Sequence, residues 1–461
     1  MPNAEMPRVV EETKVATRSL QLQCCALLGI LVVAALVAPA SNTPGEVEPV
    51  QNPEFDLLIK NGHVIDPRNG VDAVVDVAVG AGKIAMIGAN IAPSRAREVA
   101  DANGFYVTPG LIDIHAHVFW GSEVNAAYSN GYSAVQPDDH SFRSGQTTLV
   151  DAGGSGWRNF PQFKDQVIDR SKTRVLAFLN IVGSGMKGGP VEQDLADMNT
   201  KLTAMRIRQY RDVIVGIKVA HYSGPEWDPV TRAVAAGAEV GVPVMVDFGG
   251  QTPPTPPLSL EDLLLKYLRP GDILTHTYAQ VSGRIAIVDE NGKVRPYVLA
   301  ARKRGIIFDA GHGGGSFVFR QAVPATKQGF FPDVISTDLH IGSMNSGMKD
   351  ILNTMSKFLN LGMPLQDVIK ANTSKAAEVI KHPELGHLSV GAAADIAVLN
   401  LRRGKFGFID VSGAKMLGDQ KLECELTVRG GQVVWDLNGI SRPLWTDVKE
   451  PGGEQGRIRR H

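Results

Sequence analysis

The sequence has few cysteines, few aromatic residues and almost no net charge. It contains three cysteines in 461 residues, aromatic residues make up 6%, and the formal net charge at pH 7 is −1. The body of the chain has no run of basic residues, so it lacks the phosphate-neutralising surface that nucleic-acid binding needs. Nucleic acid is therefore not expected as a partner. The length leaves room for one domain of about 250–300 residues and a smaller companion.

The chain also lacks an apolar run of full membrane-spanning length. Its apolar segment at residues 24–38 is shorter than the roughly 20 residues that a membrane helix requires. A polar N-terminal stretch that contains basic residues precedes this segment. Ala38-Pro39-Ala40, at its end, provides the small residues that are typical of a signal-peptide cleavage site. We therefore predict that residues 1–40 are a signal peptide and that the protein is exported, periplasmic or secreted. The alternative is an uncleaved segment that anchors the protein to a membrane.

Removal of this segment would leave a single cysteine. Cys24 and Cys25 would leave with the signal peptide, and Cys424 would have no partner within the chain. An internal disulfide is therefore not expected, and the fold must depend on burial of apolar side chains and on any bound metal.

Short strand patterns occur at both ends of the remaining chain. After a polar linker, residues 41–54, alternating apolar residues separated by Asn-Gly and Gly-rich turns predict strands. Their ranges are 55–60, 64–66, 74–79 and 83–87 near the start, and 395–399, 425–429 and 432–435 near the end. Neither set is large enough to bury a core alone. We therefore predict one small β-sandwich built from residues 55–104 and 386–440, followed by a polar tail, residues 441–461.

The middle of the chain, residues 105–385, alternates apolar runs with helical patterns. The runs lie at residues 111–114, 147–151, 174–181, 213–219, 242–247, 272–276, 305–309 and 334–338. Eight strands that alternate with helices predict an α/β fold, a (β/α)8 TIM barrel. Between the third and fourth strands, residues 191–212 are expected to be helical, with Leu195, Met198, Leu202 and Met205 on one apolar face.

The first predicted barrel strand ends in a His-Ala-His motif. His115 and His117 are two residues apart, so in a strand both imidazoles point to the same side. Two converging imidazoles suit a divalent ion such as zinc. The alternative is a pair of core histidines that are hydrogen-bonded to their neighbours.

The other histidines favour a metal site. Six of the eleven histidines fall at the carboxyl ends of predicted barrel strands, where barrel enzymes have their active sites. They are His115, His117, His221, His276, His312 and His340, and Lys218, Asp247, Asp309 and Asp338 lie at the same ends. A group of imidazoles and carboxylates at one rim is typical of a metal-dependent hydrolase.

Motifs in a fixed order along the chain resemble the amidohydrolase superfamily, which includes dihydroorotases, hydantoinases, ureases and aminoacylases. They include Asp56-Leu-Leu-Ile-Lys-Asn-Gly62, the stretch from Pro109 to His117, and Gly391-Ala-Ala-Ala-Asp395. The stretches Gly216-Ile-Lys218, Phe308-Asp-Ala-Gly-His-Gly313 and Ile335-Ser-Thr-Asp-Leu-His340 resemble the amidohydrolase/deacetylase branch, with enzymes similar to N-acyl deacetylases and acetyl-mandelate esterases.

This resemblance implies roles for several residues of the rim. His115, His117 and Asp338 would hold one divalent ion, with zinc as the expected metal. Lys218, carboxylated by carbon dioxide, would bridge to a second ion that His276 also binds. Asp338 would in addition be the catalytic proton shuttle.

Four positions have alternative interpretations. The family normally has a histidine at the fifth strand, where this chain has Asp247. This aspartate is either a ligand of the second ion or the cap of the following helix, and a further alternative is an empty second site in a mononuclear or degenerate enzyme. Substrate contact and a supporting hydrogen bond are equally open for His312, His221 and His340.

The resemblance implies hydrolysis of an amide bond, N-acyl or cyclic, or of an acetyl ester in a small molecule by metal-activated hydroxide. The alternatives are a dihydroorotase- or hydantoinase-like cyclic amidase and a non-catalytic exported barrel that binds ligands. A serine esterase is not expected because the chain lacks a Gly-x-Ser-x-Gly elbow. The sequence leaves the oligomeric state open, a homo-oligomer included.

The predicted signal peptide can be tested by intact mass. Protein from the native envelope should begin near Ser41, because signal peptidase cuts after small residues such as Ala40. Mass spectrometry of the purified protein measures this directly. Recovery of the full-length chain in the membrane fraction alone would instead indicate an uncleaved anchor.

Overall fold

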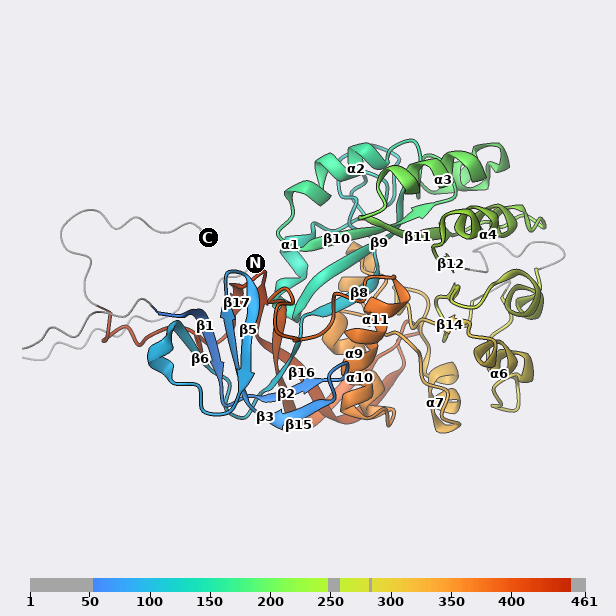
Figure 1. Ribbon diagram of the computed structural model, residues 1–461. Helices are drawn as coiled ribbons and strands as arrows, with labels where there is room; N and C mark the ends of the chain where they lie inside the picture. Colours follow the sequence, from blue (N-terminus) through green and yellow to red (C-terminus); the bar gives the residue numbers. More distant parts are fainter. Residues whose placement is uncertain (1–52, 248–257, 282–283, 449–461) are drawn as a thin grey trace, which may run out of the picture. The chain divides into compact units, whose positions relative to one another are not determined.

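The computed structural model of the protein describes residues 53–247, 258–281 and 284–448 (Figure 1). The predicted signal peptide and nearly all of the predicted linker lie outside these residues, as does the end of the predicted tail. In the part of the chain that the structure describes, no helix combines the length and the apolar character needed to cross a membrane.

A seven-stranded sheet forms the centre of the α/β part of the chain. All of its pairings are parallel, and its strands follow the sequence from one edge to the other, in the order β14-β13-β12-β11-β10-β9-β8. These strands are β8 (Leu111–Ala116), β9 (Gln146–Gly156), β10 (Arg174–Asn180), β11 (Ile214–Val219), β12 (Val244–Val246), β13 (Ile273–Leu274) and β14 (Ile307–Phe308). They correspond to the first seven strands that the sequence predicts for this region.

The eighth predicted strand, residues 334–338, does not form a continuous strand. It has single parallel bridges, from Val334 to Asp309 and from Leu339 to Ala116. The ladder is interrupted because Asp338 has a left-handed φ of 50°, and because the amide of Thr337 donates to the side chain of Asp113 at 3.2 Å instead of to a strand. The segment thus contacts both edges of the sheet without being a regular strand of it.

Helices follow these strands, and they pack on both faces of the sheet, with α4 in one apolar cluster and α11 in the other. They are α1 (Pro137–His140), α2 (Phe160–Gln166), α3 (Thr200–Gln209), α4 (Asp228–Val240), α5 (Leu260–Asp262), α6 (Pro296–Lys303), α7 (Phe319–Lys327), α8 (Ile341–Met344), α9 (Ile351–Asn360), α10 (Leu365–Ala371) and α11 (Ser374–Val379). Successive strand residues point to opposite faces. Leu149 and Ala177 therefore join the core that contains helix residues such as Ala233, whereas Val150 and Phe178 join a second apolar cluster.

The helix between the third and fourth strands is shorter than the sequence predicts. It is α3, which begins after Asn199, whose side chain accepts a hydrogen bond from the amide of Leu202 at 3.0 Å. Residues 189–197 form two short 3-10 turns instead of helix, η4 (Gly189–Gln193) and η5 (Leu195–Asp197). The predicted apolar face is confirmed for Met198, which is 1% exposed, but is wrong for Met205, which is 48% exposed.

Two further sheets lie outside the parallel sheet, and the larger of them combines strands from both ends of the chain (Figure 1). The four-stranded sheet has the order β5-β4-β1-β6, with β5 (Lys83–Gly88), β4 (Asp76–Gly80), β1 (Phe55–Lys60) and β6 (Ala96–Asp101). The six-stranded sheet has the order β17-β16-β15-β7-β2-β3, with β17 (Gln432–Asp436), β16 (Lys415–Arg429), β15 (Ile396–Ile409), β7 (Tyr106–Pro109), β2 (His63–Asp66) and β3 (Val71–Val74). Leu57, Val107, Val398 and Leu426 belong to one apolar cluster of these sheets.

Strands β15 and β16 form a hairpin much longer than predicted, with 14 and 15 residues. It extends beyond the sheet to helix α9, where the amide of Leu422 donates to Ser356 Oγ at 2.9 Å. The hairpin therefore also packs on the α/β part of the chain.

The buried side chain of Asp113 connects three segments at the start of the parallel sheet. Its Oδ1 accepts the amides of His115 and Thr337, at 3.1 and 3.2 Å. Its Oδ2 accepts Thr337 Oγ1 at 2.5 Å and Gln146 Nε2 at 3.0 Å. One carboxylate thus ties β8 to β9 and to the segment that contains Asp338.

A charged network around Asp395 links the composite sheet to β10. Asp395 is 11% exposed and accepts hydrogen bonds from Arg174 at 2.6 Å, Arg429 at 3.1 Å and the amide of Gly430 at 2.8 Å. These contacts hold the residues that precede β15 against a strand that is more than 200 positions earlier in the chain.

Asp395→Asn should lower the free energy of unfolding by about 1–3 kcal/mol, because it leaves two largely buried guanidinium groups without a charged acceptor. Urea unfolding measures the change. The matched control is Glu239→Gln, because the side chains of the Arg208–Glu239 ion pair are 51% and 43% exposed, respectively. This variant should change the free energy of unfolding by less than about 1 kcal/mol. Equal effects of the two variants would contradict this role of Asp395.

Candidate metal centre

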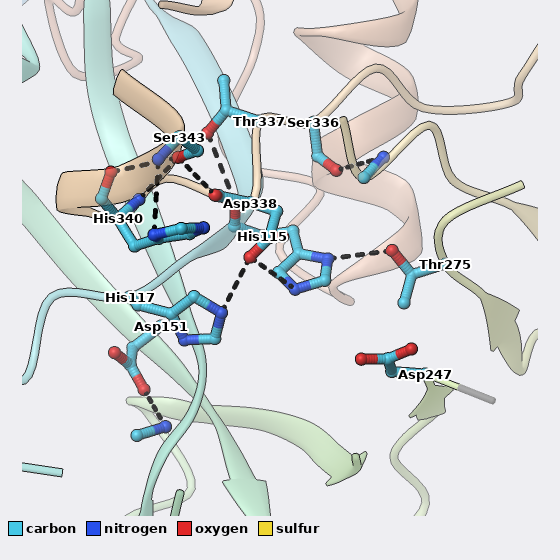
Figure 2. Close-up of polar contacts among 12 residues, drawn as sticks. His115, His117, Asp151, Asp247, Thr275, Ser336, Thr337, Asp338, His340 and Ser343 are labelled. Carbon is cyan, nitrogen blue, oxygen red and sulfur yellow. Dashed lines mark hydrogen bonds and ion pairs between the residues drawn. The ribbon is translucent and has the colours of Figure 1, made fainter. Parts of the chain in front are cut away.

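His115, His117 and Asp338 come together at the carboxyl end of β8 (Figure 2). Asp338 Oδ1 lies 2.9 Å from His117 Nε2 and 3.6 Å from His115 Nε2. Both histidines are buried, with 1% and 3% of their surface exposed. The two imidazoles that the strand period predicts on one side thus face one carboxylate, which comes from the other end of the α/β region.

The orientation of the His115 ring is set by a chain of hydrogen bonds behind it. Its Nδ1 lies 2.8 Å from Thr275 Oγ1 (Figure 2). Thr275 Oγ1 in turn donates to Asp309 Oδ2 at 2.7 Å. Because the Thr275 hydroxyl proton goes to Asp309, its oxygen accepts the Nδ1 proton of His115. The lone pair of His115 is then on Nε2, which faces Asp338.

His276 is held in the same way. Its Nδ1 lies 2.6 Å from the carbonyl oxygen of Gly311, to which it donates, so that Nε2 carries the lone pair. One donor atom each from His115, His276 and Asp338 lie within 4.8 Å of one another. Three ligand atoms from three separate segments therefore converge on one point.

Lys218 lies on β11, and its side chain is buried beside these histidines. Its Nζ is 3.0 Å from His115 Nε2 and 3.7 Å from the sulfur of Met245. Its stem passes over Gly153, where a Cβ atom would come within 2.8 Å of Lys218 Cβ. Burial lowers the pKa of Lys218, although the carboxylates of Asp247 and Asp338 oppose this shift.

Asp247 follows β12 directly and faces two imidazoles. Its Oδ2 is 3.3 Å from His276 Nε2 and 3.5 Å from His221 Nε2. Burial alone would raise the pKa of Asp247. The charges of the two imidazoles have a larger, opposite effect, so the pKa of Asp247 lies below its ordinary value. The next helix in the described chain, α5, is capped by Ser259, which accepts the amide of Asp262 at 3.2 Å. The alternative role as a helix cap therefore finds no support at α5.

Asp338 is an ionised carboxylate in a constrained backbone position. Its φ is 50°, and its carbonyl oxygen accepts Ser343 Oγ at 2.8 Å. Burial alone would raise the pKa of Asp338, but the hydrogen bond from His117 lowers it to about 2. A Cβ atom on Gly313 would lie 2.3 Å from Asp338 Oδ2, so the glycine leaves room for the carboxylate.

The three histidines predicted at the substrate wall occupy different positions. His221 has a partly exposed side chain, and its Nδ1 lies 2.7 Å from Glu192 Oε2. His340 is half-buried, and its Nδ1 accepts the amides of Gly342 and Ser343 at the start of α8.

His312 is fully buried. Its ring stacks on Phe317 with centroids 4.6 Å apart, and its Nε2 is 2.5 Å from Lys357 Nζ. The other ring nitrogen contacts the carbonyl oxygen of Gly313 at 2.9 Å. Both nitrogens of His312 therefore have protein partners.

Several residues around the centre escaped the sequence analysis. Thr275 directly precedes His276, and this adjacency is the one local signal for it. Glu192 lies in the turn η4, which the sequence reasoning placed in a helix. Tyr128 stacks on His117 with ring centroids 4.4 Å apart, and it comes from a loop whose contacts no strand or helix pattern indicates.

The donor set suits a divalent metal. His115 and His276 both have Nδ1 engaged by a neighbour and Nε2 directed inward, which is how metal-binding imidazoles are usually oriented. Among the described residues, the buried Nδ1 of His117 has no hydrogen-bond partner. Imidazole nitrogen with carboxylate oxygen is a ligand combination that zinc accepts.

Comparison with known proteins agrees with this geometry. A family model described as the amidohydrolase family matches residues 318–434. A deacetylase of Brucella anthropi is 34% identical over 381 residues, which cover 80% of this chain and 90% of that protein.

Two solved structures have a similar fold over most of the chain. A crystal structure of an adenine deaminase has a TM-score of 0.73 and 29% identity, and covers 83% of this chain and 100% of its own. A crystal structure of a dihydroorotase has a TM-score of 0.72 and 30% identity, with 82% and 99% covered. The chain therefore belongs to the amidohydrolase superfamily, and it is an enzyme that hydrolyses carbon–nitrogen bonds.

Proposed function

We propose that this enzyme is a metal-dependent deacylase that releases the amine and the carboxylic acid from an N-acyl small molecule. The observation that carries the proposal is the convergence of donor atoms from His115, His276 and Asp338 within 4.8 Å, beside the buried Lys218. The deacetylase relative, which is similar over most of the chain, supports the choice of an acyl amide as substrate.

Two groups of residues would hold the metal. His115, His117 and Asp338 would bind one divalent ion, and Lys218, Asp247 and His276 a second. Zinc fits both groups because each offers nitrogen and oxygen ligands. When bound, such ions supply the Lewis acidity that polarises a carbonyl group and lowers the pKa of water.

Lys218 would join the second group as a carbamate. Only its neutral amine reacts with carbon dioxide, and burial favours that form. The nitrogen forms a bond to the carbon of carbon dioxide and loses one proton, which gives a side chain with a single negative charge and two oxygen ligands. Its position beside His115 Nε2, at 3.0 Å, supports this role.

Asp338 would move the proton of the reaction. Its Oδ1 accepts a proton from the attacking water and delivers it to the leaving nitrogen as the amide bond breaks. The pKa of Asp338 lies below its ordinary value, so the carboxylate is ionised before the reaction, and its Oδ1 lies 2.9 Å from His117 Nε2.

We further propose that the α/β region, residues 105–385, is a closed eight-stranded barrel. The two bridges of residues 334–339, to Asp309 on one side and to Ala116 on the other, support closure of the sheet. Residues 55–104 and 386–440 would then form the composite β-sandwich, and the polar tail from residue 441 would follow.

We also propose that the enzyme is exported. The apolar run at residues 24–38 and the following Ala38-Pro39-Ala40 support a cleaved signal peptide. A small-molecule substrate outside the cytoplasm would then be its partner.

Removal of metal tests the proposed function. Dialysis against a chelator should abolish hydrolysis, and Zn²⁺ should restore it, more fully with bicarbonate because Lys218 then has its carbon dioxide. Product release is measured for N-acyl amino acids, cyclic amides and acetyl esters, with N-acyl amides expected to react fastest. Full activity of metal-free protein would disprove metal dependence, and activity on cyclic amides alone would disprove the deacylase assignment.

Asp338→Asn should reduce kcat by about 10²–10⁴-fold, because the amide cannot accept the proton of water. Amide hydrolysis and far-UV circular dichroism are measured together. Asp367→Asn is the control, since Asp367 is exposed on α10, and it should leave both unchanged. Turnover near the wild-type value in Asp338→Asn would rule out the proton transfer.

A further inference from the structure

A second imidazole stands at the edge of the proposed second metal position. His221 lies two residues beyond the end of β11, and its Nε2 is 3.5 Å from Asp247 Oδ2. His276 Nε2 is 3.3 Å from the same oxygen atom. One carboxylate oxygen thus faces imidazole nitrogens from two different strand ends.

The backbone of His221 is held in an unfavourable conformation. Its φ is 57°, in the left-handed region that residues with a side chain seldom adopt. Gln193 stabilises it, because its Nε2 donates to the carbonyl oxygen of His221 at 2.8 Å and its Oε1 accepts the amide of Ser223 at 2.9 Å. A strained residue that neighbours hold in place on both sides is typical of a functional position.

Glu192, which precedes Gln193 in the turn η4, orients the ring of His221. Glu192 is 1% exposed, and its Oε2 lies 2.7 Å from His221 Nδ1. Its other oxygen accepts the amide of Gly188 at 2.6 Å, which fixes the carboxylate. Because Nδ1 donates to Glu192, Nε2 is the ring nitrogen that faces Asp247, and it carries a lone pair when the ring is neutral. This is the carboxylate–histidine arrangement that orients metal ligands in proteins.

The distances around Asp247 Oδ2 are compatible with ligands of one ion. Hydrogen bonds between nitrogen and oxygen are about 2.7–3.2 Å long, and shorter when charged. Two ligands bound tetrahedrally to zinc at about 2.0–2.1 Å are separated by about 3.3–3.4 Å. The separations of 3.3 and 3.5 Å around Asp247 Oδ2 lie close to the second value.

We propose that His221 is a ligand of the second metal ion, through Nε2, and that Glu192 is the residue that orients it. This inference rests on the proposed function, because it assumes that Lys218, Asp247 and His276 hold an ion. His221 adds a neutral nitrogen to a group that otherwise has one imidazole and two anionic side chains. It also explains why a buried glutamate and a strained histidine occur together at this strand end.

Metal binding, not activity, provides the test. Wild-type protein, His221→Ala and Glu192→Gln are titrated with Zn²⁺, and bound metal is counted by elemental analysis. Cobalt-substituted samples add a visible spectrum, whose intensity reports the coordination number. The matched control is His382→Ala, because His382 Nδ1 pairs with Glu384 at 2.7 Å in a histidine–carboxylate contact at the protein surface.

His221→Ala should lower the metal content from two ions toward one and change the cobalt spectrum, while His382→Ala keeps two ions. Glu192→Gln should lower the affinity for the second ion by about 10–100-fold, which is the usual effect of losing a residue that orients a ligand. The double variant His221→Ala/Asp247→His should recover two ions, because it returns an imidazole to the same group. This rescue, with melting temperatures, separates loss of a ligand from failure to fold.

The outcomes distinguish this inference from the proposed function. Wild-type protein that binds no metal overturns both. Wild-type protein that binds one ion overturns the role of His221 but leaves a metal-dependent hydrolase. If His221→Ala binds two ions with unchanged affinity, the role of His221 as a ligand is also overturned. His221 would then be a substrate contact or an imidazolium between Glu192 and Asp247.

Discussion

The candidate metal centre depends on one buried carboxylate that is not itself a candidate ligand. Asp113 accepts hydrogen bonds from the amide of His115 and from the amide and hydroxyl groups of Thr337. It therefore joins the first strand of the parallel sheet to the segment before Asp338. Burial raises the pKa of Asp113 to about 7, although these hydrogen bonds oppose the shift. The Asp113 carboxylate, whose burial is energetically unfavourable, thus aligns residues that are more than 200 positions apart in the sequence. Without that alignment, His115 and Asp338 would have no reason to face each other.

Three residues of the candidate site have left-handed backbone conformations. His221, His276 and Asp338 all have left-handed φ values, of 57°, 55° and 50°. Each is held by a contact outside the centre: Gln193 for His221, Gly311 for His276 and Ser343 for Asp338. Such conformations usually cost about 1–3 kcal/mol each, and they persist where neighbouring contacts determine them. The fold thus maintains unfavourable local conformations in order to direct ligand atoms inward.

The electrostatics of the centre explain why a cation fits it. Asp247 and Asp338 both have lowered pKa values and are ionised, and Asp309, behind His115, has a pKa that burial raises to about 6. In a buried region such charges repel one another more strongly than in water. Imidazoles and Lys218 offset part of this repulsion, and the carbamate proposed for Lys218 would replace its positive charge with a negative one. Divalent ions would then balance a group of side chains that is mostly anionic.

The sequence alone determined the features that depend on local periodicity. The two-residue spacing of His115 and His117 predicts that they share one side of a strand, and the alternation of apolar runs predicts seven of the strands in the parallel sheet. The contacts of Asp247 with His221 and His276, the Glu192–His221 pair and the burial of His312 against Lys357 were decided only by the tertiary structure. So was the irregular form of residues 334–338, because side chains that are distant in sequence replace the strand hydrogen bonds there. Period and propensity act between near neighbours, whereas these contacts depend on how separate strand ends meet in space.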